Sequence, residues 1–335
     1  MSIVSTFVNK CLSLNRLGEK WCNKVIQSII EAGRTISYVE TYNPSQSDSL
    51  HLAIKGCDNK TFMHEFERVV RFAVAKLKLK RVKIGFDTTE DLTWCKNNYS
   101  LRPSVYEHPL MSWQFLNVSI VEPYFIPLMS IPYRQIDDLD NLVIGLLNYI
   151  RTLPIIVELI LLDRGFYHAH LIDYLDGRKR GYSWPYLMLV PEREIQRTYI
   201  QQTRDADLRF ASYKHTFKYS RDKSKWHPST TIMVRIVDEK TAWCYATNQR
   251  PSLNLCLEYP KRWNLETGFR THDEARIKSK SINLLIRFFY HLTGMLLIIL
   301  WRLQNTINAM VFKRYLKQIE YQFNNLILVK GGHPT

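Results

Sequence analysis

The sequence predicts an α/β protein with interleaved strands and helices, helical N- and C-terminal regions, and a β-rich basic insertion. The prediction rests on changes in hydrophobic period. The period is helical over residues 1–80, becomes that of strands separated by a helix over residues 81–190, and returns to helical after about residue 250. The regions expected from these changes are 1–80, 81–190, 191–250 and 251–335.

The first region is expected to be helical because two segments place apolar residues at spacings of three and four. These segments run from Glu19 to Ala32 and from Thr61 to Leu79. Between them, "TYNPSQSDS" predicts a loop, because Asn-Pro and repeated serine favour turns. No helix-turn-helix spacing is evident in this region.

Strands dominate the second region. "RVKIGFDTTED" predicts a short strand ending at an acid, Asp87, and "SWQFLNVSIVEPYFIPLMSIPYRQ" predicts two strands separated at Glu122-Pro123. The segment "IDDLDNLVIGLLNYIRTL" predicts a helix with acids in its first turn, as the helix dipole favours. The apolar run "IIVELILL" then predicts a buried strand leading into Asp163, followed by a turn, a short helix and another strand.

Residues 191–250 are rich in Arg and Lys and end in the strand-like "TTIMVRIVDEKTAWCYATN", which predicts an inserted, partly β, basic subdomain. The region after it contains a segment, Ile282 to Leu303, that is long enough to span a membrane. Because Arg287 and His291 lie in its first half, where charge is costly in lipid, we expect a buried core helix. A single-span anchor remains the alternative.

The composition indicates a folded, basic protein. The chain has 335 residues, of which 46% are hydrophobic and 13% aromatic, and its formal net charge is +15. A folded protein with this excess of Lys and Arg is typically steered toward a polyanion, most commonly DNA or RNA. An ordinary basic enzyme is the alternative on charge alone.

The cysteines are scattered and form no CxxC pair or Cys/His cluster with zinc spacing. This pattern favours a reducing compartment over a disulfide framework or a structural zinc site. The first residues lack a continuous apolar core, so we expect no signal peptide.

Three acids stand out as candidate metal ligands. Asp87 and Asp163 follow apolar strand segments, and Glu266 lies in the helical "YPKRWNLETGFR". Acids past buried strands lie at the carboxyl edge of a sheet, where α/β folds place their chemistry. Taken singly, each aspartate could be a turn or capping residue, and Glu266 could pair with Arg262 or Arg270. Together, the three supply the oxygen ligands that two Mg²⁺ ions need for phosphodiester chemistry.

The blocks "IGFDTTED", "LLDRGFY" and "YPKRWNLETGFR" resemble the acid-bearing blocks of the DDE transposases of bacterial and archaeal insertion sequences, in particular the insertion-sequence-4 group. Tyr259, Arg262 and Glu266 fill the first three places of that group's pattern of Tyr, Arg, Glu and Lys, with matching spacing. The fourth place holds Asp273 instead of Lys. The resemblance covers roughly residues 80–303 and includes "YATN" just before the last block.

The resemblance implies an RNase H-like mixed sheet flanked by helices, with the β-rich insertion between the second aspartate and the glutamate. It implies that Asp87, Asp163 and Glu266 are catalytic and hold two Mg²⁺ ions, with Mn²⁺ as a substitute. The expected partners are double-stranded transposon ends and target DNA, bound by a dimer. The helical region 1–80 is a candidate for recognising those ends. The expected location is the cytoplasm of a prokaryote, at the nucleoid, without stable membrane association.

The resemblance also implies DNA contacts around the acids. Tyr259 and Arg262 would bind phosphates near the cleaved end, and Trp226 in the insertion could stack on an unpaired base. The alternative is a packed aromatic residue and a structural ion pair. The full set of candidate DNA-binding residues is Tyr259, Lys261, Arg262, Arg270, Arg164, Lys223, Lys225 and Trp226.

Other functions stay open at this point. Within the same class, the chain could be an RNase H-like nuclease or an inactive transposase remnant, and Asp273 at the lysine position keeps the remnant in view. In a different class, it could be a non-catalytic nucleic-acid-binding protein or a membrane-anchored protein, in which the acids would have no catalytic role.

Overall fold

The strands of the protein form one mixed sheet. The computed structural model describes residues 2–12, 38–42, 44–95, 101–104, 110–177, 181–217, 227–306 and 309–331. The strands in this part of the chain are β1 (Arg81–Thr93), β2 (Arg102–Pro103), β3 (Met111–Glu122), β4 (Ile126–Tyr133), β5 (Ile156–Leu162), β6 (Tyr186–Leu189), β7 (Phe210–Thr216), β8 (Ser229–Ile236) and β9 (Ala242–Thr247).

The sheet has the order β2-β3-β1-β5-β6-β9-β8-β7, with β4 paired to β3. Strands β1, β5 and β6 are mutually parallel, whereas the other pairs are antiparallel. This confirms the mixed sheet flanked by helices. The strands of residues 191–250 continue the same sheet, because β9 pairs directly with β6. The expected insertion is therefore bonded edge to edge with the strands that precede it.

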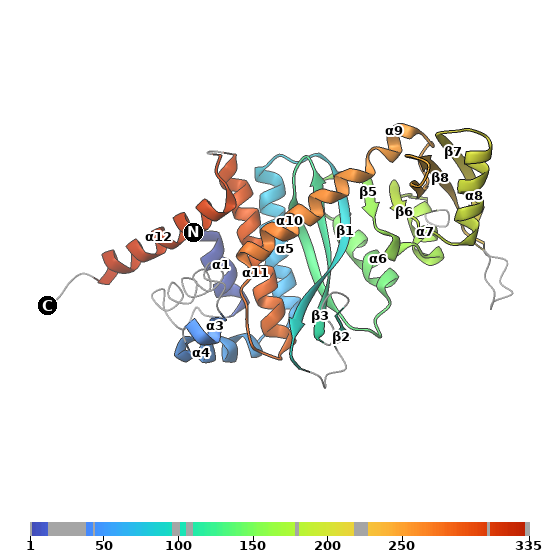
Figure 1. Ribbon diagram of the computed structural model, residues 1–335. Coiled ribbons are helices and arrows are strands. Elements are labelled where there is room, and N and C mark those ends of the chain that lie inside the picture. The colour runs from blue at the N-terminus through green and yellow to red at the C-terminus, as the bar shows by residue number, and fades with distance from the viewer. Residues whose placement is uncertain are drawn as a thin grey trace.

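Helices cover the sheet on both sides (Figure 1). Helices α5 and α11 lie side by side against β4, while α6 packs against β3 and α7. The helices and short helical turns are α1 (Ser2–Cys11), α3 (Val39–Tyr42), α4 (Pro44–Lys55), α5 (Asn59–Lys76), α6 (Leu139–Ile150), η2 (Arg164–Phe166), α7 (Ala169–Asp176), α8 (Glu194–Asp205), α9 (Leu253–Cys256), η3 (Tyr259–Arg262), α10 (Trp263–Ala275), α11 (Leu284–Asn305) and α12 (Phe312–Gly331).

Helix α11 is the buried core helix that its sequence predicts. Within the described residues it is the one helix long and apolar enough to cross a membrane, and 83% of its most apolar window is buried inside the protein. Its polar side chains also find partners: Arg287 pairs with Asp91, and the His291 ring bonds to the Asn117 side chain. Polar groups in an apolar core are tolerated when they are hydrogen-bonded in this way.

The N-terminal region differs from expectation in one place. The loop predicted for residues 41–49 is wrong, because α3 and α4 occupy most of that stretch. Proline suits the first turn of a helix, where its missing N–H has no partner to lose, so Pro44 begins α4 instead of breaking it. The predicted helix from Thr61 to Leu79 is confirmed as α5. The one predicted from Glu19 to Ala32 lies outside the described residues.

The prediction that a strand ends at Asp87 is also wrong, since β1 continues to Thr93. The continuation is paired on one side only. Strand β5 accompanies β1 only as far as Gly85, whereas β3 stays paired to it along its whole second half. Residue 87 therefore lies where β1 separates from β5. The sheet is open on that side of the residue, just as it would be if the strand ended there.

Candidate active site

Asp87 and Asp163 lie at the same level on neighbouring strands. Gly85 of β1 pairs with Leu161 of β5, and each aspartate follows two residues after its member of that pair. Asp163 comes directly after β5, where it accepts a hydrogen bond from the Arg164 N–H at 2.7 Å and so caps η2. The parallel register brings the two carboxylates together although they are far apart in sequence.

Helix α10 brings the third acid over these two strands. An ideal Cβ on Gly85 would lie 2.7 Å from Leu265 Cδ1, and one on Gly268 would lie 2.3 Å from the Phe125 ring. Glycine at residue 268 allows the helix to approach the Phe125 ring this closely, and at Gly85 the end of the Leu265 side chain rests against the strand. Because Leu265 is pressed against Gly85, the next residue, Glu266, is held beside Asp87.

The Arg262 guanidinium lies among the three carboxylates. Its Nη1 is 3.6 Å from Asp87 Oδ2, while its Nη2 is 4.0 Å from Asp163 Oδ2 and 3.5 Å from Glu266 Oε1. Exposure of the acid side chains rises from 24% at Asp87 to 34% at Asp163 and 49% at Glu266, whereas the Arg262 side chain is only 11% exposed. We call these four residues the acid cluster.

The acid cluster carries more negative than positive charge. The pKa of Asp87 is raised to about 6, chiefly by burial and to a smaller extent by the nearby Asp163 and Glu266, against the lowering effect of Arg262 and of the Thr88 N–H. By formal charge, one guanidinium faces three carboxylates. The Arg262 Nε is itself buried and has no hydrogen-bond partner among the described residues.

Tyr259 contacts the acid cluster through both its hydroxyl and its ring. The side chain is buried, its ring packs against Tyr245 with centroids 5.2 Å apart, and its hydroxyl donates to Asp163 Oδ1 at 3.5 Å. The Arg262 guanidinium lies over the same ring at 5.9 Å. Tyr245 belongs to the "YATN" segment, so β9 contributes directly to the platform on which Arg262 rests.

A ring of alternating charges holds η3 against the sheet. Lys83 of β1 pairs with Glu122 at the end of β3, at 2.7 Å, and with Glu258 just before η3. Lys261 of η3 pairs with the same carboxylates at 2.9 and 2.7 Å. These four residues, the buttress, fix the segment that carries Tyr259 and Arg262.

A cleft of about 560 Å³ extends from the acid cluster along the second half of β1 and the exposed face of α10. Asp87 and Glu266 line one end, and Asp273 and Arg276 line the other. Arg270 also lines it, is exposed, and forms no ion pair with any described residue.

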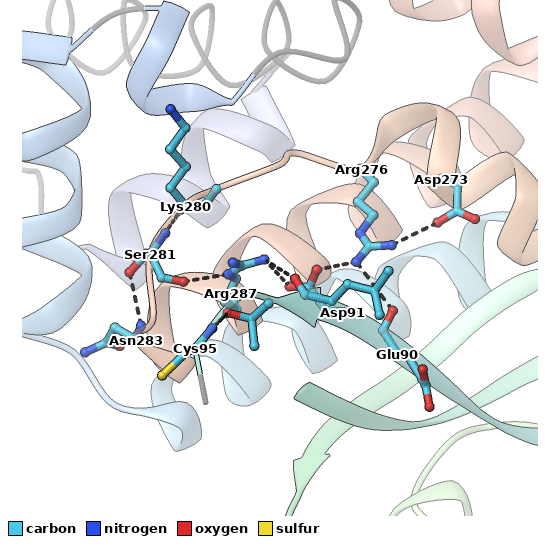
Figure 2. A network of polar contacts seen from close by, with 12 residues as sticks. Glu90, Asp91, Cys95, Asp273, Arg276, Lys280, Ser281, Asn283 and Arg287 are labelled. Carbon is cyan, nitrogen blue, oxygen red and sulfur yellow. Dashed lines mark hydrogen bonds and ion pairs between the residues drawn. The ribbon is translucent and has the colours of Figure 1, made fainter. Parts of the chain in front are cut away.

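The far end of α10 is tied down by a second charged network, shown in Figure 2. Asp91 of β1 accepts from Arg276 at the end of α10 and from Arg287 of α11, the latter at 3.0 Å. Arg287 also donates to the Ser281 carbonyl at 2.7 Å. Asp273 pairs with the other side of Arg276 at 3.7 Å. We call Asp91, Arg276 and Arg287 the clamp.

The candidate DNA-binding residues occupy different environments. Arg262 and Tyr259 lie in and under the acid cluster, Arg270 lines the cleft, and Arg164 is exposed beside Asp163. Lys261 already pairs with two carboxylates in the buttress. The remaining three candidates, Lys223, Lys225 and Trp226, lie outside the described residues.

Comparisons with known proteins were made at the levels of family, sequence and structure. No protein-family model matches the chain, and no curated protein matches its sequence. In structure, the chain is similar to a piggyBac transposase determined by cryo-electron microscopy in a synaptic complex with hairpin DNA. The TM-score is 0.61 at 11% sequence identity, and the match covers 100% of this chain and 79% of that chain. The fold is RNase H-like and transposase-like.

The donor set of the acid cluster suits hard divalent cations, which prefer carboxylate oxygens. The excess of carboxylates over guanidinium groups points the same way. The arrangement is not yet that of a coordination shell: in the described part of the chain, no three His, Cys, Asp or Glu side chains converge closely enough to hold an ion. At the acid cluster, the Arg262 guanidinium stands between them.

Several residues that shape the site gave no signal in the sequence. The buttress joins Lys83, Glu122 and Glu258, which are widely separated along the chain. The clamp joins Asp91 to Arg287. In the sequence, Arg287 indicates only that its helix is a poor candidate for a membrane span. The alternating pattern of β1 indicates that Lys83 is half-exposed, but the neighbouring sequence does not indicate which carboxylates pair with it.

Proposed function

We propose that this protein is a DNA transposase of the DDE type, resembling the insertion-sequence-4 group, that cuts and joins transposon ends. The observation that carries the proposal is the convergence of Asp87, Asp163 and Glu266 on one guanidinium, at the point where β1 separates from β5. The transposase-like fold supports it, because the structurally similar protein is a transposase bound to DNA.

In this proposal the three carboxylates are metal ligands for two Mg²⁺ ions, with Mn²⁺ as a substitute. When bound, the ions would activate the attacking water or 3′-hydroxyl and stabilise the leaving oxygen. The chain's own contribution is to hold the ligands in place. The β1–β5 register sets the spacing of the aspartates, and the contact of Leu265 with Gly85 sets the height of Glu266 above them.

DNA would lie along the cleft, with its reacting phosphate at the acid cluster. Arg270 supplies an exposed cation without a carboxylate partner among the described residues, which suits a phosphate contact. Arg164 offers a second exposed cation next to Asp163. The net charge of +15 would strengthen binding along the whole DNA backbone. We further propose that two copies act together on paired DNA ends, in the cytoplasm of a prokaryotic cell.

The test is metal-dependent nicking of supercoiled plasmid DNA by the full chain, in the presence of Mg²⁺ or Mn²⁺. Asp163→Asn should abolish nicking while the protein stays folded, because it removes a ligand charge but keeps the side-chain shape. A matched control is Asp205→Asn at the exposed end of α8, remote from the cluster, which should nick like the wild type.

Nicking that survives Asp163→Asn would rule out the assigned site. Nicking without any joining of labelled DNA ends would favour an RNase H-like nuclease. Metal binding without nicking would favour an inactive remnant, for which Asp273 at the lysine position is the first residue to examine.

A further inference from the structure

Arg262 is the most buried member of the acid cluster, although it carries the charge that a phosphate contact would need. Its side chain is 11% exposed, against 49% for Glu266. A cation that binds DNA is usually accessible, whereas this one is directed at three carboxylates. Its position is that of a counter-ion to the acids.

The contacts of Arg262 are numerous but long. Its three ion pairs measure 3.5–4.0 Å, beyond the 2.7–2.9 Å of a charge-assisted hydrogen bond. Neither terminal nitrogen forms the paired, parallel bonds that make arginine–carboxylate contacts strong. Its buried Nε has no hydrogen-bond partner in the part of the chain that the structure describes. The guanidinium is therefore shared among the acids and bound firmly by none.

We propose that Arg262 is a resident counter-ion that keeps the three carboxylates together before metal ions bind, and that metal binding displaces it. This inference rests on the proposed function, since it assigns the acids to metal ions. The displaced guanidinium then becomes available to a DNA phosphate, so that metal loading prepares the site for DNA.

Charge explains both why Arg262 stays among the carboxylates without metal ions and why metal ions displace it. Without a cation, three carboxylates at one partly buried point repel one another and pay for lost hydration. Two divalent ions carry four times the charge of one guanidinium and repel it at short range. The cluster is most open at Glu266 and Asp163, so ions would enter from that side.

The experiment measures Mn²⁺ affinity of the full-length protein without DNA, by calorimetry and by electron paramagnetic resonance. Arg262→Gln should bind Mn²⁺ about tenfold more tightly than the wild type, because the ion no longer competes with a resident cation. Arg262→Lys should fall between the two. The matched control is Arg270→Gln, which removes the same charge from the adjacent helix without touching an acid and should leave Mn²⁺ affinity within about twofold.

Affinity of Arg262→Gln equal to or below that of the wild type would overturn the proposal, as would an equal gain in Arg270→Gln. Asp163→Asn separates the two levels of inference. If it loses Mn²⁺ binding while Arg262→Gln shows no gain, the counter-ion role fails and the metal site stands. If it binds Mn²⁺ like the wild type, the metal site itself fails, and the counter-ion role with it.

A measurement on the wild type avoids dependence on the folding of the variants. A crystal structure with Mn²⁺ and without DNA should show the Arg262 guanidinium no longer within 4 Å of all three carboxylates. A structure in which Mn²⁺ is bound at the acids and the three contacts persist would overturn the displacement.

Discussion

The two ends of α10 hold arginine–carboxylate groups with opposite charge balance. At its start, the acid cluster sets one guanidinium against three carboxylates, with contacts of 3.5–4.0 Å. At its end, the clamp sets two guanidinium groups around Asp91, with one contact at 3.0 Å and the other shorter (Figure 2). Both groups include residues of β1 and lie at α10, but the charges are closely paired only in the clamp.

The difference is between a group whose charges are paired, as in a structural tie, and a group whose charges suit the function that we propose. In the clamp both oxygens of Asp91 are engaged, and the arginines make further bonds to backbone carbonyls. Such a group holds α10, α11 and β1 in one arrangement. In the acid cluster the negative charge is undercompensated, which is costly for folding but suits cation binding. By fixing the end of α10, the clamp helps to position the acid cluster at the start of the helix.

The largest expected effect lies in the acid cluster and concerns activity. Glu266→Gln should lower metal-dependent DNA cleavage by about a thousandfold or more, equivalent to about 4 kcal/mol of transition-state stabilisation. Stability in urea should stay the same or rise, because one of three mutually repelling charges is removed. Kinetics of plasmid cleavage and urea unfolding check the two parts.

Glu274→Gln is the matched control for that prediction. It makes the same change two turns further along α10, at a residue paired only loosely with Lys313, at 3.6 Å. It should leave cleavage and stability unchanged. A strong loss of stability in Glu266→Gln would contradict the view that the acid cluster is undercompensated.

The next largest effect lies in the clamp and concerns stability. Asp91→Asn should lower the free energy of unfolding by about 3 kcal/mol, because it removes the carboxylate that two largely buried arginines share. Urea unfolding measures it. Asp273→Asn, a change at the 63% exposed partner of Arg276, should cost less than about 1 kcal/mol. Equal costs for the two variants would contradict the assignment of the clamp.

A smaller effect is expected from acidification of the buttress. Hydrogen bonding to Lys83 lowers the pKa of Glu122, and the pKa of Glu258 is also lowered because bonds to Lys261 and Lys83 outweigh its burial. A carboxyl whose pKa is lowered in the folded state stabilises the fold when the pH is above 4.5, its pKa in the unfolded state. This stabilisation is lost as the pH falls through the lowered pKa of the folded state.

Stability measured by urea unfolding from pH 6 to pH 3 should therefore decline below about pH 4.5 in the wild type. The part of this decline that comes from the buttress should be smaller in Lys83→Met, which lacks the central cation. A pH profile with the same slope in both proteins would show that the ring of charges does not act as a unit.

The smallest expected effect concerns Asp273 in the cleft between the two groups. Asp273→Lys should raise DNA affinity about threefold and steepen the slope of log K against log salt by about 0.9, if the new side chain contacts one phosphate. Stability should change little, because residue 273 is exposed. Fluorescence anisotropy at several salt concentrations measures both quantities. Unchanged affinity and slope would place the DNA away from this end of the cleft.

The parts of the fold that the sequence predicted are those with a local pattern. The alternating and apolar runs predicted β3, β4 and β5, and the helical period predicted α5, α6 and α11. The failures were at places where local signals conflict. Asn-Pro and serine were interpreted as a loop at residues 41–49, although Pro44 starts a helix there. The acid in "VKIGFDTTED" was interpreted as a strand end, although pairing with β3 carries β1 through it.

The candidate site divides in the same way. Strand-end and helical positions singled out Asp87, Asp163 and Glu266, and the structure brings all three to Arg262. The sequence offered Arg262 as a phosphate contact and Lys261 as another. It could not show that Arg262 also faces Asp87 and Asp163, or that Lys261 pairs with Glu122, since these partners are distant in the chain.

By itself, the sequence determined the strands and helices that have a clear period, and which residue types could hold a divalent cation, because periodicity and side-chain chemistry are local properties. The tertiary structure alone decided the sheet order, the separation of β1 from β5 at Gly85, and the charge balance at each end of α10. Those features arise from packing between distant segments, above all the contact of Leu265 with Gly85 that sets the height of the helix over the acids.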